Sequence, residues 1–213
     1  KIGTAADGAL NVRGFIEHPD VQLPPRADGK LDVGRCVGKN GTFTVIRDDG
    51  EGIPFVGTSP LVSGEIAEDL SAYFLTSEQR PTAVALGVKI APDGRCIGAG
   101  GVFLQPLPGA GDEALDFAQE AIGRYRNLSS VIAEAGVQSV LSAFGAKDVS
   151  VRDVRFFCHC SRDRAASAVL AMGREDARAL LAQQGEIRVH CHYCNVDYTF
   201  DEDDLRKLFG ENA

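Results

Sequence analysis

The sequence predicts an α+β protein with an N-terminal domain of mixed sheet and helix, a helical linker and a small C-terminal domain. Three observations support this class. Short β-branched and apolar runs separated by turn residues occupy the first half of the 213-residue chain. Helical periodicity replaces them after about residue 112. Four of the six cysteines then follow from residue 158 onward. We expect the parts to span residues 1–111, 112–156 and 157–213.

The first strand pair is expected around a short turn. Residues 42–47 read Thr-Phe-Thr-Val-Ile-Arg, a β-branched and aromatic run. Asp48-Asp49-Gly50 is a turn signal, and a second extended run follows near Phe55 and Val56.

An amphipathic helix and a buried hairpin complete the first domain. The helix is expected to end before Pro81, because apolar residues recur at helical spacing. These residues are Ile66, Leu70, Tyr73 and Phe74. Two apolar segments, 82–90 and 95–105, are joined by Ala-Pro-Asp-Gly at 91–94, which predicts a hairpin. Leu-Pro-Gly-Ala-Gly at 107–111 ends the domain.

The linker is expected to be helical and only loosely stable. Asp112 can cap a helix, and a shorter helix would end at Gly145. The apolar residues of these helices are Leu115, Ala118, Ile122, Tyr125, Val140, Leu141 and Phe144. Gly123 and Gly136 interrupt the region, at a cost of about 1 kcal/mol each relative to alanine.

The C-terminal segment is expected to contain helices and one hairpin. Residues 161–172 and 175–183 are helical and close at Gly173 and Gly185. Strands at 186–190 and 196–200 flank a tight turn, and Asp201 then caps a last helix. The inward residues of that helix are Leu205, Leu208 and Phe209.

The clustered cysteines predict a zinc site. They form one C-x-C and one C-x-x-C pair, and paired thiolates at short spacing are the usual ligands of a tetrahedral zinc ion. The predicted ligands are Cys158, Cys160, Cys191 and Cys194. Four buried free cysteines or permanent disulfides would not explain the spacing as well. Nearby histidines are expected as bystanders or partners of the ligands, and they are His159, His190 and His192. Cys36 and Cys96 are expected to be small core or strand residues.

The zinc can be structural or regulatory. Bound zinc can supply on the order of 10–16 kcal/mol of folding free energy to a small unit. A disulfide within C-x-C or C-x-x-C closes a very short loop and would supply roughly 1.6–1.9 kcal/mol. Oxidation of the ligands should therefore unfold the segment. Strained local disulfides are also readily reduced. The spacing alone leaves both roles open.

Charge and hydropathy exclude several classes of function. The net charge is −8, and the densest basic stretch, Arg152–Arg164, is interrupted by Asp153 and Asp163, so nucleic-acid binding is not expected. No apolar run is long enough to span a membrane, and no signal peptide pattern is present. Clustered cysteine pairs indicate a reducing compartment, the cytoplasm. The chain starts at Lys1 and its only methionine is Met172, so we expect a further N-terminal part.

The chain resembles the redox-regulated heat shock protein 33 chaperones over almost its whole length. The C-terminal motifs are Phe157-Cys158-His159-Cys160-Ser161-Arg162, Gly185-Glu186-Ile187, Cys191-His192-Tyr193-Cys194 and Tyr198-Thr199-Phe200. Upstream motifs occur in the family's order: Gly64–Leu70, Tyr73-Phe74, Ser77-Glu78-Gln79, Pro81–Val88, Gly100-Gly101 and Leu107–Ala110. Family members begin with a further helical and strand region, and residues 6–15 match the family only loosely.

The resemblance implies an ATP-independent holdase that binds unfolding client proteins under oxidative stress. In the family, the reduced zinc-bound form is inactive, and oxidation releases zinc and forms two disulfides. By position these would be Cys158–Cys160 and Cys191–Cys194. The zinc domain and a metastable linker, here 112–156, then unfold, and the active form can be a homodimer. No catalytic residues are implied.

Three other functions compete with this interpretation. A thiol-disulfide oxidoreductase could use Cys191 and Cys194, but the expected hairpin lacks a βαβ context. A plain structural zinc module needs no redox chemistry. A zinc-ribbon nucleic-acid module is disfavoured by the acidic run at 197–204.

The glycines at 98–101 could suggest a phosphate loop, but they lie within a strand-like run and indicate close packing instead.

Overall fold

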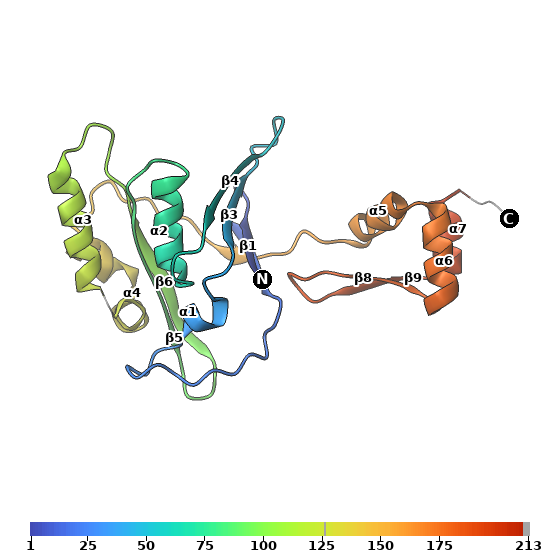
Figure 1. Cartoon of the computed structure of the whole chain (residues 1–213), viewed down its shortest axis with the longest axis horizontal. Coiled ribbons are helices and arrows are strands. Elements are labelled where there is room, and N and C mark those ends of the chain that lie inside the picture. The colour runs from blue at the N-terminus through green and yellow to red at the C-terminus, as the bar shows by residue number, and fades with distance from the viewer. Residues whose placement is uncertain (126, 211–213) are drawn as a thin grey trace. The chain divides into compact units, whose positions relative to one another are not determined.

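The computed structural model describes residues 1–125 and 127–210 and confirms the α+β class (Figure 1). The strands are β1 (Ile2–Ala6), β2 (Asn11–Ile16), β3 (Thr42–Arg47), β4 (Phe55–Pro60), β5 (Ala83–Ile90), β6 (Cys96–Leu104), β7 (Arg155–Phe156), β8 (Ile187–His190) and β9 (Asp197–Phe200). The helices are α1 (Val33–Val37), α2 (Ile66–Thr76), α3 (Asp112–Arg124), α4 (Leu128–Ala143), α5 (Arg162–Met172), α6 (Arg174–Gln184) and α7 (Glu202–Leu208).

The described chain divides into two units. One comprises residues 21–149, and the other joins residues 1–20 to 150–213. The linker helices α3 and α4 thus belong to the unit that contains the β3–β4 and β5–β6 hairpins. A functional division into parts that end at residues 111 and 156 stays a prediction.

The unit of residues 21–149 contains both hairpins expected from the sequence. β3 and β4 pair antiparallel from Thr42 opposite Pro60 to Arg47 opposite Phe55. β5 and β6 pair from Ala83 opposite Leu104, with an irregularity near Ile90. Helix α2 packs against β4 and β5 and ends before Pro81, as predicted.

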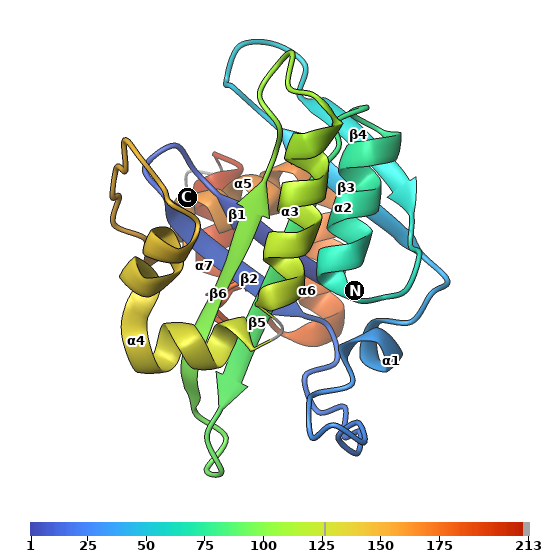
Figure 2. The same ribbon diagram turned by 90° about the vertical axis from the view of Figure 1, so that its left-hand side faces the viewer.

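Helix α4 packs closely on the β5–β6 hairpin because glycines face it (Figure 2). A Cβ at Gly98 would lie 2.7 Å from the Cβ of Ala133, and one at Gly100 would lie 2.5 Å from Cδ1 of Ile132. The glycines of this run therefore serve helix-to-sheet packing, consistent with the close packing inferred from the sequence.

Two details of the linker differ from the sequence prediction. Gly111, not Asp112, is the N-cap of α3, because Asp112 already has helical geometry as the first residue of the helix. The second helix begins at Leu128, well before the predicted apolar cluster, and it is broken by Gly136, whose φ of 73° is left-handed. The predicted interruption at Gly136 is thus a kink between two helical segments.

The other unit contains a three-stranded sheet and a small helix-hairpin domain. β1 pairs antiparallel with β2, and β2 pairs parallel with β7. β8 and β9 form the predicted C-terminal hairpin. Buried residues from α5, α6, α7 and this hairpin form the core of the C-terminal part: Ala165, Val169, Ala177, Ile187, Phe200 and Leu205.

The predicted helix ends in this unit are confirmed. Ser161 caps α5 by accepting the N–H of Arg164 at 3.2 Å. Gly185 ends α6 in the left-handed conformation. Asp201 and Asp204 form a reciprocal capping box at the start of α7.

Candidate metal centre

The four predicted cysteine ligands come together at one place. All four Sγ atoms lie within 4.8 Å of one another. The Sγ atoms of Cys158 and Cys191 are 3.6 Å apart, and those of Cys160 and Cys194 are 3.2 Å apart. Tetrahedral zinc with Zn–S bonds of about 2.3 Å requires S···S separations of about 3.8 Å. The arrangement of donors therefore fits a zinc ion.

The C-x-x-C pair lies on the turn between β8 and β9. The N–H of Cys191 donates to the carbonyl of Val196 at 2.9 Å, and the N–H of Asn195 donates to the carbonyl of Cys191 at 2.8 Å. Asn195 adopts a left-handed φ of 58°, which asparagine tolerates better than most residues. These bonds close the loop and hold Cys191 and Cys194 on one side of it. We call residues 191–194 the knuckle.

The C-x-C pair is held between β7 and the first turn of α5. Cys160 directly precedes the capping residue Ser161, so the start of the helix fixes its position. Ala165 of α5 is buried in the core below. The small side chain of Ala168 lines a cavity of about 230 Å³ that is also lined by Cys158, Cys160 and Cys191.

The thiols influence one another's ionisation. Burial disfavours the Cys191 thiolate, but backbone N–H groups of Cys194 and Tyr193 stabilise it and bring its pKa to about 7. The side chain of Cys160 raises the pKa of Cys194 to about 12. Deprotonation of Cys194 is therefore favoured by a nearby cation, which supports the fit to a divalent metal.

Tyr198 of β9 supports one of the sulfurs. Its hydroxyl donates to Sγ of Cys160 at 3.2 Å. This hydrogen bond to Cys160, together with burial, raises the pKa of Tyr198 to about 12, so the phenol stays protonated and remains a donor. The sequence analysis did not identify this partner, although Tyr198 lies in the Tyr-Thr-Phe motif after the knuckle.

The three histidines lie outside the group of sulfur ligands found in the described residues. Nε2 of His159 is 2.8 Å from Oδ2 of Asp7, and Nδ1 of His190 is 2.6 Å from Oδ1 of Asp197. The ring of His192 lies edge-on to that of His190. Each of these histidines therefore has a neighbour other than the four sulfurs, and their role as bystanders or partners of the ligands stays a prediction.

The β1–β2 hairpin contacts the centre through two residues that the sequence analysis missed. Phe15 and Tyr193 meet edge-on, with ring centroids 5.2 Å apart. The guanidinium of Arg13 lies 4.9 Å from the centroid of the same tyrosine ring. No local pattern in the sequence could reveal these contacts, because about 180 residues separate the partners.

A polar network joins the same hairpin to the segment before α5. Asp7 accepts hydrogen bonds from the backbone and side chain of Asn11, at 2.9 and 2.7 Å, in addition to its contact with His159. These donors, with the Asn11 side chain first, hold the pKa of Asp7 well below its usual range. Arg155 of β7 donates to Oδ1 of Asn11.

The two remaining cysteines belong to the unit of residues 21–149. Cys96 is a strand residue in β6, as expected, although it is exposed. Cys36 is exposed in α1, so the expectation of a core or strand position was wrong for it. The short helix α1 was not recognised in the sequence.

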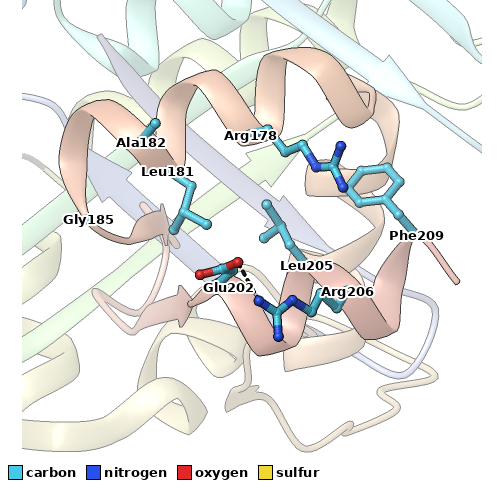
Figure 3. Close-up of a pocket in the computed structure, with 8 residues that line it drawn as sticks. All are labelled: Arg178, Leu181, Ala182, Gly185, Glu202, Leu205, Arg206 and Phe209. Carbon is cyan, nitrogen blue, oxygen red and sulfur yellow. Dashed lines mark hydrogen bonds and ion pairs between the residues drawn. The ribbon is translucent and has the colours of Figure 1, made fainter. Parts of the chain in front are cut away.

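A second and larger cavity lies between α6 and α7 (Figure 3). It measures about 460 Å³ and is lined by Arg178, Leu181, Ala182, Gly185, Glu202, Leu205, Arg206 and Phe209. Glu202 pairs with Arg206 at 2.6 Å. No cysteine or histidine lines this cavity.

Comparison with known proteins gives consistent results. A family model described as Hsp33 protein matches residues 1–201. A 33 kDa chaperonin of Bacillus cytotoxicus is 37% identical over 203 residues, which are 93% of this chain and 70% of that protein. A 33 kDa chaperonin of Desulforamulus reducens is 39% identical over 202 residues, 92% of this chain and 68% of that protein.

A solved structure is also similar. It is the crystal structure of a 33 kDa chaperonin, a heat shock protein 33 homologue, from Thermotoga maritima. The TM-score is 0.83 at 33% identity, and the match covers 98% of this chain and 72% of the other. In the part of the chain that the structure describes, no helix is long and apolar enough to cross a membrane.

Proposed function

Since this chain belongs to the Hsp33 family, and is therefore a chaperone and not an enzyme, we propose that it is an ATP-independent holdase switched on by oxidation of its four clustered cysteines. The observation that carries the proposal is the group of four Sγ atoms within 4.8 Å, on a domain with a small core. The reduced, metal-bound form is the inactive one.

In the proposal, one Zn²⁺ is held by the thiolates of Cys158, Cys160, Cys191 and Cys194. Bound zinc supplies charge neutralisation and a tetrahedral crosslink between the knuckle and the C-x-C loop. The Tyr198 hydroxyl orients and stabilises the Cys160 sulfur. The protein works in a reducing compartment, the cytoplasm, where such thiolates persist.

Oxidation converts the four thiolates into two disulfides. For each pair of thiolates, one peroxide molecule accepts two electrons, its O–O bond breaks, one S–S bond forms, and two protons taken up from solvent join the oxygens to give two waters. The pairing Cys158–Cys160 and Cys191–Cys194 rests on the family resemblance. Distances alone do not assign it, because a tetrahedral site brings all four sulfurs near one another.

The energetic balance favours unfolding after oxidation. Two short-loop disulfides supply roughly 1.6–1.9 kcal/mol each, whereas zinc supplies on the order of 10–16 kcal/mol. Within residues 157–210, the core cluster has six buried residues, of which Phe200 is the one aromatic, and a core of this size rarely supplies more than about 3–5 kcal/mol. We therefore expect residues 157–213 to unfold, and the linker of residues 112–156 to follow.

Clients bind apolar surface in the first 111 residues and in the unfolded linker. A holdase needs exposed apolar area, and several large side chains of the described residues are already exposed. Ile53 is 98% exposed and Leu107 is 79% exposed. The oxidised protein can also form a homodimer.

The proposal is tested by measuring how well the protein suppresses thermal aggregation of a model client. Reduced zinc-loaded protein is compared with protein treated with peroxide under mild warming, and released zinc and free thiols are followed in the same samples. Suppression that begins only as zinc and the four thiols disappear supports the switch. Retained zinc without suppression would reduce the site to a structural zinc module. Catalysed thiol-disulfide exchange would favour the oxidoreductase instead.

A further inference from the structure

The edge of β2 that faces β7 is only partly filled. β2 is six residues long, and β7 pairs with only its first two residues, Asn11 and Val12. The N–H of Arg155 donates to the carbonyl of Leu10 at 3.3 Å, and the N–H of Phe157 donates to the carbonyl of Val12 at 3.0 Å. An extended segment of the chain therefore already lies on this edge, held by backbone hydrogen bonds.

The rest of the edge offers further backbone groups. The carbonyl of Asn11 accepts a hydrogen bond from the N–H of Asp7, and the N–H of Glu17 donates to the carbonyl of Lys1. The backbone N–H and C=O groups of the odd-numbered residues of β2 therefore point toward β1. Since backbone groups alternate along a strand, Gly14 and Ile16 present theirs to the edge shared with β7. Among the described residues, no strand pairs with these two positions on that side.

The segment that includes β7 resembles a piece of unfolded protein. Its apolar side chains point into solvent: Val151 is 84% exposed, Val154 is 61% exposed and Phe156 is 65% exposed. It is attached by backbone bonds and by polar contacts such as the donation from Arg152 to the carbonyl of Gly8 at 2.6 Å. Extended conformation and exposed apolar side chains are what an unfolding protein also presents.

We propose that this edge of β2 binds an extended segment of a client polypeptide by strand addition, and that β7 is the internal segment which the client replaces. The inference rests on the proposed holdase function and specifies how the client is recognised. Backbone hydrogen bonds do not depend on the side chains of the bound segment, so an edge of this kind can bind many different clients. Neighbouring side chains add affinity.

The metal centre controls access to this edge through the chain connection to β7. Cys158 follows β7 after a single residue, so unfolding of the metal-binding loops releases the segment that covers Leu10 and Val12. A client strand would then gain the backbone groups of β2 that β7 leaves, together with those of Gly14 and Ile16.

A proline substitution tests the strand edge. Ile16→Pro removes a backbone N–H that faces the open edge. It leaves the hydrogen bonds to β1 in place, because the backbone N–H of Ile16 does not point toward β1. Ile16→Val keeps the N–H and is the matched control. Both whole-chain variants are oxidised, and their binding to a reduced, carboxymethylated polypeptide that stays unfolded is measured. We expect Ile16→Pro to bind on the order of tenfold more weakly than Ile16→Val.

Amide hydrogen exchange of the unsubstituted chain provides a second test that needs no mutation. When the oxidised protein binds the carboxymethylated polypeptide, the amides of Gly14 and Ile16 should exchange more slowly. Equal affinity of the two variants, or unchanged exchange at both amides while the polypeptide is bound, overturns strand addition and leaves the holdase function standing. An oxidised protein that binds no unfolded polypeptide and suppresses no aggregation overturns both.

Discussion

The ring of Phe15 occupies the space that a side chain on Gly3 would need, since a Cβ at Gly3 would lie 2.3 Å from Cε1 of Phe15. The two residues face each other across β1 and β2. The same ring meets Tyr193, which lies between Cys191 and Cys194 of the knuckle. Because Gly3 of β1 has no side chain, the Phe15 ring can take the position in which it contacts Tyr193 of the knuckle.

Gly3→Ala should weaken this contact. The added methyl group must displace the Phe15 ring and so disturb its packing on Tyr193, at a cost of about 1–3 kcal/mol. The free energy of unfolding of the reduced, metal-loaded protein measures the effect. Gly8→Ala is the control, because nothing lies within 4 Å of a Cβ at Gly8. If the two variants are equally stable, the contact does not hold the knuckle.

Tyr198→Phe should lower zinc affinity without unfolding the domain. The phenylalanine ring still packs against the core, but Sγ of Cys160 loses its hydrogen bond. Loss of such a partner of a ligand lowers metal affinity by about 10- to 100-fold. Competition with a coloured chelator measures the affinity, and Tyr125→Phe in the other unit is the control. Unchanged affinity would show that the hydroxyl does not support the site.

Cys191→Ser should remove zinc and weaken the control by reduction. With three thiolates left, the C-terminal helices should loosen, and the reduced protein should already suppress aggregation. Zinc content and activity under reducing conditions check this. Cys96→Ser, an exposed cysteine in β6, should retain one zinc per chain and stay inactive when reduced. If reduced Cys191→Ser protein does not suppress aggregation and keeps its full zinc content, the ligand assignment is contradicted.

Removal of zinc by a chelator from the reduced protein should unfold the C-terminal domain before the rest. The amides of α5, α6 and α7 should lose protection from hydrogen exchange, because their shared core is small. The amides of β5 and β6 should stay protected, since α4 packs on that hairpin without any contribution from the four clustered cysteines. Uniform loss of protection in both units would argue against a separate metal-dependent domain.

The stability of the C-terminal domain should fall in acid partly through Asp204. Burial raises the pKa of this carboxyl, but the N–H of Asp201 and the guanidinium of Arg162 outweigh it and lower the pKa below its ordinary 3.8. The resulting stabilisation is present above that ordinary value and is lost as pH falls through the lower pKa of the folded state.

Asp204→Asn isolates this contribution. The free energies of unfolding of the variant and the original protein are compared at each pH from about 5 to 3, so that loss of metal affects both. The difference between them should shrink as pH falls. A constant difference would mean that the ionisation of Asp204 does not contribute.

Local rules explain why much of the fold could be predicted. The turn at Asp48-Asp49-Gly50, the capping residues Ser161 and Asp201, and the left-handed Gly185 act within a few residues of themselves. Strands β1 and β2 escaped prediction because they are short and contain residues of low strand propensity, one glycine and two alanines in β1 and one asparagine and one glycine in β2. Strand β7 has only two residues and exists only through its pairing with β2.

The sequence by itself determined the α+β class, the family and the four cysteine ligand candidates, because paired cysteine spacing and helix caps are short-range properties. Only the tertiary structure decided that the four sulfurs lie within 4.8 Å, that Tyr198 supports Cys160, and that Phe15 meets the knuckle over Gly3. Those relationships join residues up to about 190 positions apart. They depend on how strands pair and helices pack, which no local pattern encodes.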